Sequence, residues 1–164
     1  MKGICALSGE ETQLQLSHIY PKFVVKYLRS TSNDGHLRSY GNVNLVRQDG
    51  LKMHLLSRAS EQRFSAAETW FANNIFHPVT QNELKAFSYD DHLYYFIVSL
   101  LWRALHVEIN SKTYDKEAYY SQLLACEKQW RSFLNDGYVP HQFPDAYMTC
   151  KEYQENIRQP NTIK

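Results

Sequence analysis

The chain contains few cysteines and little glycine or proline, and these shortages limit what it can be. Its three cysteines, Cys5, Cys126 and Cys150, are odd in number and widely spaced, which argues against a disulfide framework and for a reducing compartment. Six glycines and five prolines leave no low-complexity segment. With 164 residues the chain can bury a core without a covalent or metal cross-link, so we expect one compact domain or one domain with an appendage.

Long hydrophobic runs are also absent. The most apolar run, from Leu93 to Leu105, is interrupted by Ser99 and Arg103 and is too short to cross a bilayer. The first five residues include no apolar segment typical of a signal peptide. We therefore expect a cytoplasmic protein without a membrane partner.

The charge of the chain is nearly balanced, with a formal net charge of +1, so nothing drives it globally toward polyanions. The distribution is uneven, however, because residues 1–63 contain nine Lys or Arg and five Asp or Glu, whereas the remaining residues contain nine and twelve. A basic N-terminal part on an acidic body indicates nucleic-acid binding. A chance imbalance on a solvated surface explains the counts equally well.

A short helix is predicted directly after Pro21. Proline suits the first position of a helix, and the apolar residues between Phe23 and Leu28 give that helix one apolar face. Residues 30–42 follow with the composition of a loop.

A β-hairpin and a second helix are predicted next. The pair Asp49-Gly50 lies between two strand-like runs, 43–48 and 51–56, and supplies the positive φ angles that a two-residue hairpin turn requires. Apolar residues at helical spacing then predict a helix from about residue 60 to residue 75, which Pro78 ends.

Two longer helices are predicted between residues 81 and 137. Asp90 can cap the first and Asp115 can cap the second, and both helices carry apolar residues at helical spacing. The stretch Asn135-Asp136-Gly137 ends the second helix. We expect the two helices to pack as an antiparallel pair, followed by a proline-containing tail over residues 138–164 whose order the sequence leaves open.

Two pairs of residues have the spacing of a zinc knuckle. Cys5-x-x-Ser8-Gly9 has the form of a C-x-x-C-G knuckle, and Ser57-x-x-Ser60 lies where the second predicted strand meets the next helix. Between the two pairs lies the segment Ser17-His18-Ile19-Tyr20-Pro21.

In this order, these residues resemble an HNH-type nuclease module, a ββα-metal motif built on a treble-clef zinc knuckle. Gln48-Asp49-Gly50, Leu55 to Glu68 and Phe71 to Phe76 also match. More narrowly, the chain is similar to a group of bacterial HNH-like proteins. The resemblance implies an α+β, mainly helical fold with a treble-clef-like HNH module over residues 1–80. It does not explain the helical hairpin over residues 81–137.

The resemblance also implies roles for individual residues. In active HNH nucleases the histidine at the strand end is the general base, which here is His18. Asn44 is the best placed residue to orient it, with Asn42 as a competitor. Ser17 and Glu61 occupy positions where metal ligands often stand, so an active version would use Mg²⁺ or Mn²⁺ to hydrolyse a phosphodiester bond.

Three of the four knuckle positions, Ser8, Ser57 and Ser60, carry a hydroxyl where the resemblance implies a thiolate. A serine hydroxyl is a poor, neutral zinc ligand, and Cys5 alone cannot hold the ion. We therefore expect no structural zinc and no other structural cofactor. Apolar burial on the two C-terminal helices is the obvious replacement, and Ser57 or Ser60 can instead cap the following helix.

Each of these side chains also has a purely structural explanation. His18 can be a strand-end histidine bonded only to backbone, and Glu61 and Glu68 can be solvated acids near a helix N-terminus. The basic residues of the short helix could contact phosphates or simply face solvent; they are Lys22, Lys26 and Arg29.

Three functions are compatible with the sequence. The first is a degenerate HNH-like module that binds DNA, RNA or a protein partner without cutting. The second is an active metal-dependent endonuclease that uses His18, Asn44 and Glu61. The third, compatible with either, is a homodimer or scaffold formed through the C-terminal helices. We rank the non-catalytic module first because of the serine substitutions.

Overall fold

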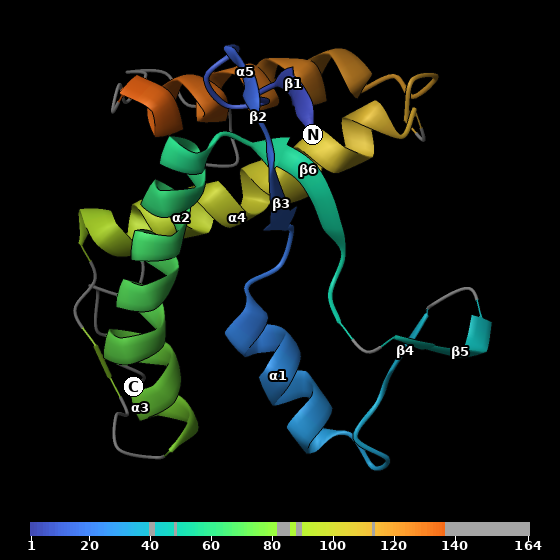
Figure 1. The fold of residues 1–164 in the computed structure, drawn as a ribbon, viewed down its shortest axis with the longest axis vertical. Helices are drawn as coiled ribbons and strands as arrows, with labels where there is room; N and C mark the ends of the chain where they lie inside the picture. Colours follow the sequence, from blue (N-terminus) through green and yellow to red (C-terminus); the bar gives the residue numbers. More distant parts are fainter. Residues whose placement is uncertain (40–41, 48, 82–85, 88–89, 113, 137–164) are drawn as a thin grey trace, which may run out of the picture.

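The computed structural model describes residues 1–39, 42–47, 49–81, 86–87, 90–112 and 114–136, and of Ser39 and residues 42–47 it describes the backbone alone. The predicted tail, residues 138–164, lies outside the described residues. The fold is mainly helical with small antiparallel strand pairs, which confirms the α+β, mainly helical class expected from the sequence (Figure 1).

The elements follow one another as β1 (Lys2–Ile4), β2 (Glu11–Gln13), β3 (Gln15–His18), α1 (Lys22–Thr31), β4 (Leu37–Ser39), β5 (Asn42–Arg47), β6 (Lys52–Leu56), α2 (Arg58–Phe71), the π-helix η1 (Ala72–Phe76), α3 (His77–Thr80), α4 (Asp91–Asn110) and α5 (Tyr120–Asp136).

The strands pair as β1 with β2, β3 with β6, and β4 with β5, all antiparallel. The predicted hairpin at Asp49-Gly50 is therefore wrong, since β6 pairs with β3 and not with β5. Gly50 lies outside the left-handed region that the tight turn would need. Pairing with β3 lets the ribbon bury Leu56 and Ser17 against α2, a gain that the local hairpin does not offer.

The helical stretch after β6 starts earlier and extends further than the sequence predicts. It starts at Arg58 because the hydroxyl of Ser57 accepts the backbone N–H of Ser60 at 3.1 Å, the geometry of an N-cap. It continues past Pro78, which comes two residues after the π-helix η1, where the regular i→i−4 hydrogen bonds of the helix are already interrupted.

A single hydrophobic cluster joins the N-terminal strands to the C-terminal helices. Trp102 of α4 is fully buried and packs edge-on against Phe64 of α2, with ring centroids 6.0 Å apart. The same cluster contains Cys5 and Leu56 from the N-terminal half and Phe133 from α5. Each apolar side chain buried in this way stabilises the fold by roughly 1.5–3 kcal/mol relative to an exposed one.

A second, smaller cluster attaches α1. Phe23 of α1 lies 4.8 Å from Phe76 and 6.5 Å from Phe96, measured between ring centroids. Phe71 and Phe96 stack at 4.1 Å and link the end of α2 to α4. Aromatic contacts therefore hold α1 below the crossing of α2 and α4 (Figure 1).

The two C-terminal helices run antiparallel, as predicted (Figure 1). The expected cap of α4 is confirmed, because Asp90 accepts the backbone N–H groups of His92 and Leu93. The expected cap of α5 is wrong: the helix starts at Tyr120, after i→i+3 turns between Tyr114 and Tyr120. None of the helices in the described ranges is long and apolar enough to span a bilayer.

Candidate functional site

The four knuckle positions come together at the start of α2. Cys5 Sγ lies 3.6 Å from Ser60 Oγ and accepts the backbone N–H groups of Ser57, at 3.2 Å, and Ser8, at 3.5 Å. Gly9 has a φ of 76°, a left-handed conformation that lets the chain turn sharply after Ser8. The two spaced pairs of the sequence therefore converge on one sulfur atom, although 52 residues separate Cys5 from Ser57.

Each hydroxyl group at the knuckle has a hydrogen-bond partner. Ser57 Oγ donates to Ser60 Oγ over 3.0 Å, and Ser8 Oγ donates to Glu10 Oε2 over 3.4 Å. Burial on its own raises the pKa of the Cys5 thiol, but the hydrogen bonds from Ser8, Ser57 and Ser60 together lower this pKa to about 6. The N–H and O–H groups around the sulfur therefore favour the thiolate over the thiol.

This donor set does not fit structural zinc. Structural Zn²⁺ sites use four thiolate or imidazole ligands, and the knuckle offers one sulfur beside three neutral hydroxyls. The expected absence of zinc stays a prediction that metal analysis can test.

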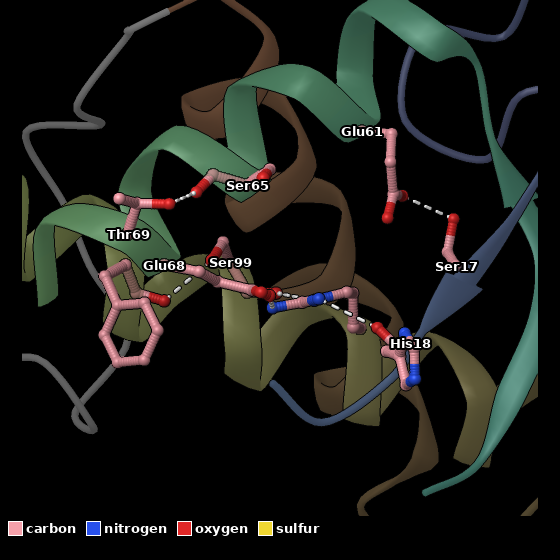
Figure 2. A network of polar contacts seen from close by, with 9 residues as sticks. Ser17, His18, Glu61, Ser65, Glu68, Thr69 and Ser99 are labelled. Carbon is pink, nitrogen blue, oxygen red and sulfur yellow. Dashed lines mark hydrogen bonds and ion pairs between the residues drawn. The ribbon is translucent and has the colours of Figure 1, made fainter. Parts of the chain in front are cut away.

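Ser17 and Glu61, the two expected metal-ligand positions, hydrogen-bond to each other. Ser17 lies in β3 with its side chain fully buried, and Glu61 lies in the first turn of α2. Ser17 Oγ donates to Glu61 Oε2 over 2.5 Å (Figure 2). Glu61 is therefore not the solvated acid that the structural explanation assumes.

His18, at the end of β3, pairs with a carboxylate from the loop before β6. Its Nε2 atom lies 3.3 Å from Asp49 Oδ1, and Asp49 Oδ2 lies 2.5 Å from Lys52 Nζ. The hydrogen bond from Lys52 is the main cause that lowers the pKa of Asp49 to about 2, so Asp49 is ionised at neutral pH. The partner of His18 among the described side chains is thus an aspartate.

Asn44, the predicted orienting residue, lies on β5, where the structure describes the backbone alone. The same holds for its competitor Asn42. The sequence did not predict Asp49 as the partner of His18. The pair Asp49-Gly50 is typical of a hairpin turn, and that turn already explained the aspartate. Its actual role requires the pairing of β3 with β6, which brings Lys52 opposite His18.

The three basic residues of α1 differ in their surroundings. Lys22 and Lys26 are exposed and lie four residues apart, on one face of the helix. Arg29 is half-buried, and its Nε atom donates to the carbonyl oxygen of Gly35 over 3.2 Å. The exposed positive charge of this helix therefore comes from the two lysines.

Arg103 is a site residue that the sequence did not reveal. It lies on α4 with 2% of its side chain exposed, and its Nη1 atom donates to the carbonyl oxygen of His18 over 2.8 Å. Its Nη2 atom lies 2.7 Å from Glu68 Oε1 on α2. The only hint in the sequence is a single arginine inside the most apolar run of the chain.

In the described part of the chain, no three His, Cys, Asp or Glu side chains gather closely enough to hold a metal ion. Glu61 with Ser17 offers one carboxylate and one neutral hydroxyl, a weak donor set for Mg²⁺ or Mn²⁺. Comparisons of the chain with protein-family models, with curated proteins and with solved structures find no match, so membership of the HNH class stays a prediction.

Proposed function

We propose that the chain is a degenerate, non-catalytic HNH-like module that binds nucleic acid. The hydrogen bond between Ser17 and Glu61 carries this proposal. The two side chains at the expected metal-ligand positions satisfy each other, and only one of them is charged. A neutral hydroxyl in place of a carboxylate or imidazole weakens the site for a hard divalent ion.

The exposed side chains next to His18 support nucleic acid as the ligand. Tyr20 is 48% exposed, and Lys22 and Lys26 follow it on the exposed face of α1. Lysines contact phosphates without regard to sequence, and an exposed tyrosine offers a ring on which a base can stack. Lys52 is engaged by Asp49 and contributes less, so we place the contact on α1.

The test is fluorescence anisotropy with single-stranded and duplex DNA and RNA over a range of salt concentrations. We expect the logarithm of the affinity to fall linearly with the logarithm of the salt concentration. Replacing both Lys22 and Lys26 by alanine should lower the slope by about 1–2, because each lost phosphate contact removes about 0.9. Affinity that does not respond to salt excludes nucleic acid as the ligand.

Lys128→Ala is the matched control for this experiment. Lys128 is exposed on α5, which lies at the opposite end of the molecule from α1 (Figure 1). Its loss should leave the slope unchanged. An equal effect of Lys128→Ala and the α1 double variant would indicate non-specific attraction with no defined contact on α1.

A protein partner or a homodimer is a further version of the binding role. Ile97 and Leu101 of α4 are 41% and 45% exposed, and they lie four residues apart on one face of the helix. Analytical ultracentrifugation of the wild type and of Ile97→Lys/Leu101→Lys tests this surface. Monomers at every concentration would exclude the homodimer.

The second candidate function is an active endonuclease with His18 as the general base. The contact between His18 Nε2 and Asp49 Oδ1 favours it, because a carboxylate that orients a histidine is a common arrangement in acid–base catalysis. The measurement is cleavage of labelled DNA and RNA with Mg²⁺ or Mn²⁺. His18→Ala should abolish cleavage, and cleavage that survives this change removes His18 from the reaction.

A further inference from the structure

The guanidinium group of Arg103 makes two hydrogen bonds and one ion pair, which reach three elements. Nε donates to the carbonyl oxygen of Ser99 over 3.2 Å, Nη1 donates to the carbonyl oxygen of His18 over 2.8 Å, and Nη2 lies 2.7 Å from Glu68 Oε1. The guanidinium carbon also lies 5.3 Å from the ring centroid of Phe64. Arg103 therefore touches α4, α2 and the end of β3 at once.

This geometry is not that of an arginine used only to pair with a carboxylate. A bidentate pair would place two parallel N–H groups on Glu68, whereas here one N–H group is used on the backbone of His18, 85 residues away in the sequence. A buried ion pair is often no more stabilising than an apolar pair of the same volume. The bond to His18 is what an apolar replacement could not supply.

The peptide group between His18 and Ile19 is held on both sides. Its carbonyl oxygen accepts Arg103 Nη1, and its N–H group donates to the carbonyl oxygen of Leu51 over 2.9 Å. Because the peptide group is planar, these two bonds fix the backbone direction at which the side chain of His18 leaves β3. Leu51 follows Asp49 by two residues. The same two hydrogen bonds therefore also position the imidazole of His18 next to the carboxylate of Asp49.

We propose that Arg103 is a positioning residue for His18, which makes the C-terminal helical hairpin a component of the candidate site. Arg103 is too deeply buried to touch a ligand and acts through the His18–Ile19 peptide group. The part of this proposal that concerns ligand affinity rests on the proposed nucleic-acid binding. The part that concerns the orientation of His18 does not.

The main test variant is Arg103→Met/Glu68→Met. It removes both partners of the buried ion pair, so no unpaired charge stays in the core and the fold is expected to persist. Arg103→Lys is the second variant, because a lysine keeps the charge beside Glu68 but cannot bond Glu68 and His18 with a rigid fork. Glu127→Gln is the matched control, since Glu127 Oε1 contacts Trp102 Nε1 and His106 Nδ1 of α4, and its replacement leaves the bond between Arg103 and His18 in place.

The first readout is the rate of amide hydrogen exchange at Ile19, measured by NMR. Circular dichroism checks that each variant keeps its secondary structure. In Arg103→Met/Glu68→Met we expect exchange at Ile19 to accelerate about tenfold or more, the factor that one hydrogen bond from a charged donor represents. Arg103→Lys should give a smaller acceleration, and Glu127→Gln should give no acceleration at Ile19 beyond the equal one in α5 that its lower overall stability causes. An unchanged Ile19 amide in folded Arg103→Met/Glu68→Met would overturn the proposal.

The second readout separates positioning from general stability. If Arg103 acts through His18, its loss and His18→Ala should weaken nucleic-acid binding non-additively, so that the combined variant binds no worse than His18→Ala alone. Additive losses would mean that Arg103 acts on the ligand site by another route. A wild type that binds no nucleic acid defeats the proposed function, while the Ile19 amide still decides whether Arg103 positions His18.

Should Arg103→Met/Glu68→Met fail to fold, Arg103→Lys takes over both readouts. Faster exchange at Ile19 together with preserved exchange in α5 would support the proposal. Equal acceleration at Ile19 and in α5 would show that Arg103 only stabilises the fold.

Discussion

Cys5 Sγ lies 3.6 Å from Ser60 Oγ, although 55 residues separate the two in the sequence. Ser57 and Ser8 approach the same sulfur through their backbone N–H groups. Four positions with the spacing of a zinc knuckle therefore surround one point, and hydroxyl groups stand at three of them. A hydroxyl and a thiol differ little in volume, so cysteines should fit at the three serine positions.

The first prediction is that Ser8→Cys/Ser57→Cys/Ser60→Cys binds one Zn²⁺ ion. Four thiolates at these positions make a tetrahedral structural site. We expect stoichiometric zinc by elemental analysis and a rise in Tm of at least about 2–4 °C, the shift that about 1 kcal/mol produces in a chain of this size.

Three cysteines at other exposed serines provide the control for restored zinc binding. The variant Ser30→Cys/Ser65→Cys/Ser121→Cys has the same thiol content on three different helices. It should retain no zinc after dialysis. Loss of zinc from the knuckle variant in the same dialysis would show that the four positions do not form a ligand cage.

The second prediction concerns the pH dependence that Cys5 confers. Hydrogen bonds at the knuckle lower its pKa from 9.0 to about 6 in the folded protein. A lowered folded pKa means that the stabilisation is fully present above pH 9 and is lost as the pH falls toward 6. Denaturant unfolding of Cys126→Ser/Cys150→Ser, in which Cys5 is the remaining thiol, should show this loss.

Cys5→Ser in the same background removes the titrating group and is the comparison for the pH series. Its free energy of unfolding should vary less between pH 6 and pH 9. The ultraviolet absorbance of the thiolate gives a direct second measurement. A thiolate that forms only near pH 9 would contradict the low pKa.

The third prediction is that Ser17→Asp creates a metal-dependent stability. A carboxylate at residue 17 would lie beside Glu61 and repel it, so the variant should be less stable than the wild type without metal. Mg²⁺ or Mn²⁺ should restore stability, because an ion that binds only the folded state stabilises it by RT ln(1 + [L]/Kd). Thermal unfolding with and without the metal measures the difference.

Ser17→Asn has nearly the same shape as Ser17→Asp and carries no charge. Its Tm should not respond to Mn²⁺. Equal responses of the two variants would show that the ion does not bind between residue 17 and Glu61.

The fourth prediction concerns Glu127, which joins α5 to α4. Glu127 Oε1 accepts Trp102 Nε1 and lies 3.0 Å from His106 Nδ1. Burial raises the pKa of Glu127, but the bonds from His106 and Trp102 outweigh it and hold the pKa below its ordinary value of 4.5. The stabilisation is therefore present above pH 4.5 and is lost as the pH falls through the lowered value.

Glu127→Gln should remove this acid sensitivity and lower stability at neutral pH by about 1 kcal/mol or more, since a charged hydrogen-bond acceptor is replaced by a neutral one. The measurement is the free energy of unfolding between pH 3 and pH 7. Glu108→Gln, exposed on α4, should follow the wild type. If Glu127→Gln still loses stability at low pH, another carboxylate causes that loss.

Several elements could be predicted from local sequence because their causes lie within a few residues. The cap at Asp90, the helix after Pro21 and the antiparallel pair of long helices follow from side-chain chemistry and apolar spacing. The hairpin at Asp49-Gly50 failed for the opposite reason. A favourable turn was outweighed by the apolar surface that β6 buries when it pairs with β3.

The candidate site divides in the same way. The spacing of Cys5 with Ser8 and of Ser57 with Ser60 was visible in the sequence, and the structure brings these positions together. The partners of the charged side chains were not visible. Asp49 beside His18 and Arg103 beside Glu68 depend on how strands and helices pack.

By itself, the sequence determined the mainly helical class of the protein and most of its helices, because helical periodicity and capping act over one or two turns. Tertiary structure alone decided that β3 pairs with β6, that Ser17 bonds Glu61, and that Arg103 reaches the backbone of His18. These contacts join residues far apart in the chain. Each contact forms because the fold as a whole then buries more apolar surface and leaves fewer polar groups unpaired than the alternatives, and this depends on the entire molecule.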